Sequence, residues 1–206
     1  MQWIWSRSWL VEEMRTKMEV NERMKRFVLT GAPGAGKTAV LRQLEVEGFS
    51  VVEEAATDVI QLQQALGVAE PWRQASFIDA IVDLQRLRQI GASFAPVDIQ
   101  FHDRSVICTA ALARYLEYSA TDLLVREMER IKREAVFEQS VFFMRGLGFI
   151  THTEARRISV GEAKRFESIH EETYRDFGFD LIFIEPASVA DRVAEIRRIA
   201  QTLLCR

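Results

Sequence analysis

The stretch RFVLTGAPGAGKTAVLRQL, residues 26–44, constrains the fold more than any other part of the chain. An apolar run, typical of a buried β-strand, leads into a loop with three glycines and then into residues with helical spacing. The loop matches the pattern G-x-x-x-x-G-K-[ST] in full. A strand, a glycine-rich turn and a helix in this order surround a phosphate group with main-chain N–H groups. The sequence therefore predicts a phosphate-binding loop, or P-loop.

Each part of this loop has a predicted role in binding a nucleoside triphosphate. Glycines allow the backbone to turn tightly and to approach phosphate oxygens. Lys37 would supply positive charge to the β- and γ-phosphates, and the Thr38 hydroxyl would bind Mg²⁺. A tight turn without a ligand is the alternative. The predicted nucleotide-binding residues are Gly31, Ala32, Pro33, Gly34, Ala35, Gly36, Lys37 and Thr38.

Short apolar runs alternate with longer helical patterns along the rest of the chain. Strands are expected at 27–30, 51–53, 97–102, 141–144 and 181–184. Helices are expected at 39–47, 55–66, 76–90, 106–117, 121–134, 160–177 and 190–204. Regular β-α alternation predicts a parallel sheet with helices on both faces. We therefore expect a three-layer α/β/α sandwich with a five-stranded parallel sheet, as in small-molecule kinases of the P-loop class.

Composition narrows the class of protein and its partners. The chain has 206 residues, of which 48% are hydrophobic and 28% charged, so a single soluble domain is expected. The net charge of −3 gives no basic field for nucleic acid, and no such partner is expected. Cys108 and Cys205 are predicted to be free thiols in a reducing, cytoplasmic compartment.

Residues 1–24 are predicted to be an N-terminal extension, helical or disordered, and residues 25–206 the nucleotide-binding domain. Three of the four tryptophans lie in the extension, which is amphipathic. One interpretation is a loose extension or sequence upstream of a later translation start. The other is a membrane or protein contact made by residues 1–23.

The nucleotide is predicted to be ATP, with GTP less favoured. Common GTPases read guanine with an Asn-Lys-x-Asp motif. The single asparagine of this chain, Asn21, lies upstream of the predicted domain, which argues for ATP or for loose selection of the base.

The third strand is predicted to end in IQFHDRS, which places Asp103 and Arg104 at the carboxyl edge of the sheet. Asp103 is predicted to hold the metal ion. Mechanical ATPases carry a glutamate where Arg104 stands, and a cation does not act as a general base. Arg104 suits the stabilisation of a transferring phosphoryl group instead. A buried ion pair at the strand end is the alternative.

The second strand ends in VVEEAATDVI, where adjacent residues point to opposite sides of the sheet. Glu54 is predicted to be the general base that accepts a proton from an acceptor hydroxyl, with Glu53 as the second choice. Acidic residues at a solvated helix N-terminus are the alternative.

The segment after the fourth strand, MRGLGFITHTEARRISVGEA, is basic and rich in glycine at its start. We predict a lid at about 145–160 whose Arg156 and Arg157 close over the triphosphate and exclude water. A solvated surface loop is the alternative.

A helical pattern covers the segment between the second and third strands. Trp72, Phe77 and Gln85 are candidates for lining an acceptor pocket. An amphipathic helix that packs Phe77, Ile81 and Leu84 into the core is favoured over that interpretation. His102 is expected to be a packed residue.

These motifs together resemble the P-loop AAA-type domain shared by the nicotinamide-riboside kinase part of the bacterial NAD regulator and the eukaryotic TRP-translocation-defect protein. The matching segments are RFVLTGAPGAGKTAVLRQLEVEGFSVVEEAA, FIDAIVDLQ, FHDRS, ARRIS and YRDFGFDLIFIEPASVADRVAEI, within about residues 25–203. The resemblance implies a kinase-like nucleotide-binding core. Family members include a kinase for a small nucleoside-like acceptor and a GTP-binding trafficking protein that contacts phospholipid.

The chain departs from the family pattern just after the Asp-Arg pair. Relatives tend to have a glycine and then an acid, whereas this chain reads DRSVICTAALARY, with Ser105 and Cys108. The Asp-Arg-Ser sequence is also similar to that of deoxynucleoside kinases.

Three functions are compatible with these motifs. The first is a small-molecule kinase whose catalytic residues are Lys37, Glu54, Asp103, Arg104, Arg156 and Arg157. The second is a nucleotide-dependent binding module with little turnover, acting on a partner or a membrane. The third is a simple NTPase, which the arginine at position 104 disfavours.

Overall fold

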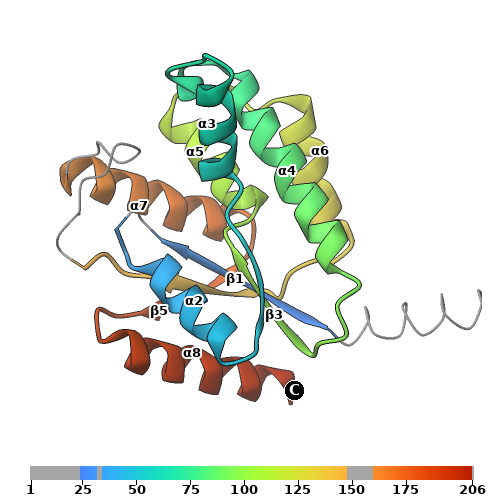
Figure 1. The fold of residues 1–206 in the computed structure, drawn as a ribbon, viewed down its shortest axis with the longest axis vertical. Coiled ribbons are helices and arrows are strands. Elements are labelled where there is room, and N and C mark those ends of the chain that lie inside the picture. Colours follow the sequence, from blue (N-terminus) through green and yellow to red (C-terminus); the bar gives the residue numbers. More distant parts are fainter. Residues whose placement is uncertain (1–23, 32–33, 148–159, 206) are drawn as a thin grey trace, which may run out of the picture.

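A central sheet of five parallel strands organises the protein (Figure 1). The computed structural model describes residues 24–31, 34–147 and 160–205. The strand order is β2-β3-β1-β4-β5, so that β1 lies at the centre of the sheet. The strands are β1 (Lys25–Gly31), β2 (Ser50–Val52), β3 (Ile99–Asp103), β4 (Ser140–Met144) and β5 (Asp180–Ile184).

Helices cover both faces of the sheet. One face packs against α2 (Lys37–Val46) and α8 (Val189–Leu204). The other face packs against α4 (Ser76–Ala92), α5 (Val106–Tyr115), α6 (Asp122–Arg133) and α7 (Val160–Asp176). The helix α3 (Ala56–Ala65) and the 3-10 helix η1 (Pro71–Arg73) pack against α4. This arrangement confirms the predicted three-layer α/β/α sandwich with a five-stranded parallel sheet.

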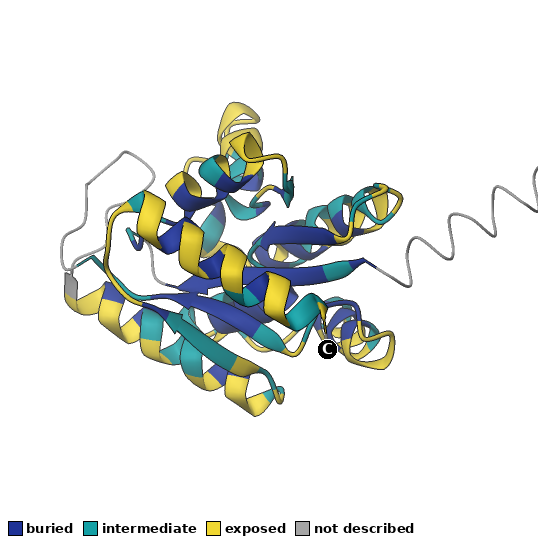
Figure 2. Cartoon of the chain, turned by 90° about the horizontal axis from the view of Figure 1, so that it is seen from below, coloured by how far each residue is buried: buried dark blue, intermediate teal, exposed yellow. Residues whose placement is uncertain are grey.

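The three inner strands, β1, β3 and β4, are buried along almost their whole length, which explains their nearly continuous apolar sequence (Figure 2). The edge strands β2 and β5 are only partly buried. On the α2 and α8 side, Phe27, Phe101 and Phe142 from three neighbouring strands are fully buried. Their ring centroids lie 5.6–6.3 Å apart in tilted arrangements, which suit the quadrupoles of aromatic rings. This aromatic layer fixes β1 between β3 and β4.

The predicted element boundaries differ from the observed ones where the backbone conformation changes. The third strand begins at Ile99 instead of residue 97, because the N–H of Val97 bonds to the Ala95 carbonyl in a turn. Helix α5 ends at Tyr115 instead of residue 117, because Glu117 adopts a φ of 61°. A residue in this left-handed conformation ends a helix.

No helix in the described part of the chain combines the length and the apolar character that a bilayer span requires. Residues 1–23 of the predicted extension lie outside the described residues, whereas Met24, its last residue, is buried. The division into an extension and a domain therefore stays a prediction.

Gly31 is the last residue of β1, and its neighbour across the sheet leaves no room for a side chain. A Cβ atom on Gly31 would lie 2.2 Å from the carbonyl oxygen of Met144, and the φ of Gly31 is 127°. Gly48 also has a positive φ, of 92°, but a Cβ atom there would meet no atom within 4 Å. A side chain at Gly48 would therefore strain only the backbone, whereas one at Gly31 would also overlap with strand β4.

We expect Gly48→Ala to cost about 1–2 kcal/mol of folding stability, the usual cost of left-handed backbone in a residue with a side chain. Gly31→Ala should cost about 2 kcal/mol more, because strand β4 must also move. Urea unfolding of both variants measures the difference. Equal losses would show that β4 adjusts freely at Met144.

Candidate active site at the carboxyl edge of the sheet

The described part of the glycine loop joins the central strand to α2. Gly34 and Gly36 have φ values of 83° and 76°, which favour glycine strongly. Gly36 is the N-cap of α2 and has no side chain to satisfy the first N–H groups of the helix. A helix N-terminus attracts an anion through its first N–H groups and the positive end of the helix dipole. Ala32 and Pro33 lie outside the described residues.

Lys37 is a buried cation at the first position of α2. Its ammonium group donates a hydrogen bond of 3.0 Å to the carbonyl of Gly31. Burial, together with the charge of Arg104, lowers the pKa of Lys37 to about 7, although Asp103 and Glu54 act in the opposite direction. An anion bound in the loop would favour the charged form of this side chain.

Glu54 and Arg104 form a short ion pair beside Lys37. The guanidinium Nε donates to Glu54 Oε1 at 2.6 Å, and the Thr57 hydroxyl donates to Glu54 Oε2 at 2.6 Å. Burial alone would raise the pKa of Glu54, but Arg104, Thr57 and Lys37 outweigh burial and hold that pKa below its ordinary value. Glu54 is therefore a carboxylate at neutral pH.

The two glutamates at the end of β2 have different surroundings. Glu53 is exposed and forms an ion pair of 2.5 Å with Arg42 on α2. Glu54 lies on the side of Lys37 and Arg104 instead. Arg88 on α4 holds the backbone between them, because its guanidinium donates to the carbonyls of both glutamates. It also forms an ion pair with Asp58.

Arg104 occupies an unusual backbone conformation with a φ of 73°. Its N–H bonds to the carbonyl of Leu29 and continues the pairing of β3 with β1, so the chain leaves the sheet at the positive φ of Arg104. Burial disfavours the charge of Arg104, but Glu54 and other neighbours outweigh burial and raise its pKa above the ordinary value. Strained backbone at a residue that bears charge is typical of functional sites.

Asp103 and Thr38 supply the oxygen atoms predicted to hold a metal ion. Asp103 ends β3 and pairs in register with Leu29 of β1. It is close enough to affect the charge of Lys37, while Thr38 is exposed at the start of α2. Hydroxyl and carboxylate oxygens suit Mg²⁺, which usually keeps several waters and phosphate ligands. The described residues contain no cluster of three or more His, Cys, Asp or Glu able to hold a metal by themselves.

Helix α7 contacts the Asp-Arg-Ser segment, residues 103–105, through buried side chains. His170 is fully buried, and its Nδ1 lies 2.9 Å from the carbonyl of Phe166. This bond makes Nδ1 the donor and leaves Nε2 to accept from Arg104 at 3.3 Å. Burial and the nearby charge of Arg104 lower the pKa of His170 to about 3. The ring is therefore neutral and orients the guanidinium.

A second buried contact joins α7 to the same segment. The Tyr174 hydroxyl lies 2.8 Å from Ser105 Oγ and 3.0 Å from Cys108 Sγ, which in turn lies 3.1 Å from Thr30 Oγ1. Ser105 also caps α5 by accepting from the N–H of Ile107. The two residues that depart from the family pattern thus link β1, α5 and α7.

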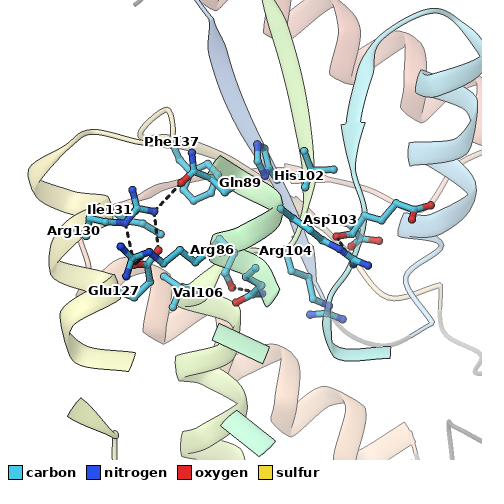
Figure 3. Close-up of a pocket in the computed structure, with 15 residues that line it drawn as sticks. Arg86, Gln89, His102, Asp103, Arg104, Val106, Glu127, Arg130, Ile131 and Phe137 are labelled. Carbon is cyan, nitrogen blue, oxygen red and sulfur yellow. Dashed lines mark hydrogen bonds and ion pairs between the residues drawn. The ribbon is translucent and has the colours of Figure 1, made fainter. Parts of the chain in front are cut away.

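A pocket opens beside Asp103 and Arg104, between the β2–β3 edge and helices α4 and α6 (Figure 3). Its lining combines apolar side chains such as Ile131 and Phe137 with polar ones, among them Gln85, Arg86, Gln89, Glu127 and Arg130. Arg130 is bonded to both Glu127 and Gln89, as Figure 3 shows.

The three residues proposed to line an acceptor pocket, Trp72, Phe77 and Gln85, lie in different surroundings in the structure. Gln85 lines the pocket and accepts from the Thr109 hydroxyl at 2.8 Å. Phe77 and Ile81 are buried in the core with Trp72 and Leu84 packed against them, which agrees with the amphipathic helix. His102 is buried edge-on against Phe137, as expected of a packed residue.

The lid prediction falls mostly outside the described residues, and Arg156 and Arg157 are among those not described. Arg145, at its start, pairs with Glu167 and Glu171 of α7 at 3.1 and 3.0 Å. Its guanidinium also lies 4.0 Å from the centre of the Phe183 ring.

Sequence reasoning missed Arg88, His170, Tyr174 and Arg192 as parts of the site. Arg192 on α8 donates a 2.8 Å hydrogen bond to the carbonyl of Ala35 in the glycine loop. The one signal available in the sequence was an arginine or histidine at a position that an amphipathic helix would bury. The partners, however, lie on distant segments.

A central strand, a glycine loop with a buried lysine and charged residues at neighbouring strand ends define a P-loop protein with a kinase-like fold. The family model described as an AAA domain matches residues 26–192, and the chain belongs to that family. No curated protein matches the chain.

Two solved structures share the fold. Deoxyadenosine kinase from M. mycoides, with products dCMP and a flexible dCDP bound, has a TM-score of 0.56 and 13% identity. That match covers 86% of this chain and 99% of the kinase. NadR protein in complex with NR has a TM-score of 0.58 and 16% identity, over 81% of this chain and 45% of NadR. At these identities the likeness shows the fold alone.

The neutral state of buried His170 predicts a dependence of stability on pH. Its pKa lies near 3 in the folded chain and near the ordinary 6.5 in the unfolded chain, so the unfolded state binds the proton first as pH falls. The contribution of neutral His170 to the free energy of unfolding is complete above about pH 6.5. Below that pH it is lost at about 1.4 kcal/mol per pH unit. Buried His102 behaves in the same direction.

His170→Gln keeps a donor and an acceptor but does not titrate. Between pH 7.5 and 5.5 its free energy of unfolding should therefore fall by about 1.4 kcal/mol less than that of the wild type, as measured by urea unfolding at both pH values. The same pH dependence in both proteins would contradict the assignment.

Proposed function

We propose that this protein binds ATP with Mg²⁺ and transfers the γ-phosphoryl group to a small-molecule acceptor. The observation that carries the proposal is the buried Lys37 at the head of α2, with the Arg104–Glu54 pair beside it. Lys37 and the loop amides would hold the β- and γ-phosphates. GTP is the second choice of nucleotide.

The acceptor hydroxyl would attack the γ-phosphorus in line with the bond to the β-phosphate oxygen. Its proton would pass to Glu54, the new O–P bond would form on the acceptor, and ADP would leave. Arg104 and the lid arginines Arg156 and Arg157 would stabilise the negative charge on the transferring group. Mg²⁺, held through Thr38 and Asp103, would neutralise charge on the phosphate oxygens.

A nucleoside-like acceptor fits this proposal best. Amide side chains such as Gln85 suit hydrogen-bonded recognition of a base or a carboxamide, and Gln85 is fixed next to Arg104 through the carbonyl of Ser105. The sequence resemblance to the kinase part of the bacterial NAD regulator supports the same class. An acceptor hydroxyl would have to reach Glu54, whose two oxygens already bond to Arg104 and Thr57.

That closed pairing also favours a second candidate function. A carboxylate that is fully engaged is a weak general base, so the protein would act as a nucleotide-dependent binding module with little turnover. The predicted contact of residues 1–23 with a partner or a membrane belongs to this alternative. The two functions differ in whether nucleotide is consumed when an acceptor is supplied.

The direct test is a screen of nucleosides and related metabolites for ATP consumption by the purified protein. We expect turnover only with particular acceptors, and none in the Lys37→Ala variant. Binding of Mg·ATP by calorimetry with no consumption across the screen would support the binding module instead. No heat from Mg·ATP or Mg·GTP at millimolar concentration would refute both.

The adjacent glutamates provide a matched pair of variants. Glu54→Gln should lower acceptor-dependent turnover by about 10²- to 10⁴-fold, the usual contribution of a general base. Glu53→Gln should change it by less than about threefold, because an exposed ion pair contributes little. Steady-state rates at saturating ATP measure both. Full turnover in Glu54→Gln would remove Glu54 from the mechanism.

A further inference from the structure

The side chain of Arg192 crosses from α8 to the glycine loop, 157 residues away in the sequence. Arg192 lies in the first turn of α8, and only 3% of its surface is exposed. Its guanidinium NH1 donates a 2.8 Å hydrogen bond to the carbonyl of Ala35. The loop is therefore held from outside by a helix at the other end of the chain.

This hydrogen bond fixes the direction of one loop N–H group. The carbonyl of Ala35 and the N–H of Gly36 belong to one planar trans peptide and point in opposite directions. Because Arg192 draws the carbonyl toward α8, the N–H of Gly36 points away from α8. Rotation of this peptide would break the bond and turn the N–H away from a bound phosphate.

Gly36 is shaped to accept this contact. A Cβ atom at Gly36 would lie 2.8 Å from NH2 and 3.1 Å from NH1 of Arg192. The φ of Gly36, 76°, independently favours glycine. The guanidinium thus lies directly against the loop backbone.

The charge of Arg192 has no counterpart in the described part of the protein. No carboxylate there pairs with it, and its buried Nε has no hydrogen-bond partner among these residues. Burial lowers the pKa of Arg192, but a guanidinium stays charged at neutral pH. A buried charge without a partner destabilises the folded state. An anion held by the adjacent loop amides would offset that cost.

We propose that Arg192 is a positioning residue of the nucleotide site, which fixes the Ala35–Gly36 peptide for phosphate binding and adds a buried positive charge behind the loop. The inference rests on the proposed function, since it takes a polyphosphate to be the ligand. It makes α8 a part of the site.

A purely structural role would predict different behaviour. If Arg192 only packed α8 against α2, its replacement would destabilise the protein and leave phosphate affinity unchanged. If it serves the anion, an apolar replacement of similar length removes an uncompensated charge. The free protein should then be equally or more stable, and only phosphate binding should weaken.

The test compares three replacements in the full chain. Arg192→Met removes both the charge and the donor, Arg192→Gln keeps only a donor, and Arg192→Lys keeps the charge. Arg198→Met, at an exposed position of the same helix, is the control. Calorimetry with Mg·ATP and with magnesium tripolyphosphate gives affinities, and thermal melting without ligand gives stability.

We expect Arg192→Met to bind both probes at least tenfold more weakly, equivalent to about 1.4 kcal/mol. Its melting temperature without ligand should be unchanged or higher. Arg192→Lys should recover part of the affinity and exceed Arg192→Gln. Tripolyphosphate should show the same loss as ATP, because the effect lies at the loop and not at the base.

Two results would overturn the inference while leaving the proposed function intact. One is wild-type affinity in Arg192→Met. The other is a loss of affinity for ATP alone, which would mean that Arg192 acts on recognition of the adenine base and not on phosphate binding. If the wild-type protein binds neither ATP, GTP nor tripolyphosphate, the proposed function fails, and this inference with it.

Discussion

The concentration of buried positive charge around one glycine loop is the constraint on which this structure depends. Lys37 and Arg192 are almost fully buried, and Arg104 is nearly so. Glu54 and Asp103 compensate the charges of Lys37 and Arg104 in part. A fold that gathers such charges must orient each of them, because buried ions without hydrogen bonds are costly.

Besides the Glu54 carboxylate, which pairs with Arg104, the surrounding elements provide that orientation with neutral groups. His170 accepts from Arg104, the Gly31 carbonyl accepts from Lys37, and the Ala35 carbonyl accepts from Arg192. None of these acceptors carries a charge that would cancel the positive field. The same arrangement holds the cations in place and preserves their attraction for an anion.

The strand order explains how these groups meet. Because β1 lies between β3 and β4, the loop after β1 is flanked by the end of β3, which carries Asp103 and Arg104. The end of β2 brings Glu54 one strand further out. Helix α7 contacts this edge through His170 and Tyr174. The ends of parallel strands thus form the crevice in which α/β proteins place their ligands.

The sequence alone determined the architecture, because apolar strands, helical spacing and the glycine pattern are local signals. It identified the loop from Gly31 to Thr38, and it placed Asp103 and Arg104 at a strand end. The preference of Glu54 over Glu53 rested on alternation along a strand, which gives opposite directions but does not say which direction meets the site. In the structure Glu53 pairs with Arg42 and Glu54 with Arg104, while the role of Glu54 as general base stays a prediction.

Only the tertiary structure revealed the supporting residues, because each is defined by a partner far away in the chain. Arg192 reads as an ordinary helix residue until α8 is packed beside the loop. Ser105 and Cys108 read as departures from a pattern until Tyr174 is found between them. Local sequence fixes which backbone conformations are accessible, whereas the compensation of buried charge depends on distances that arise only when the elements pack together.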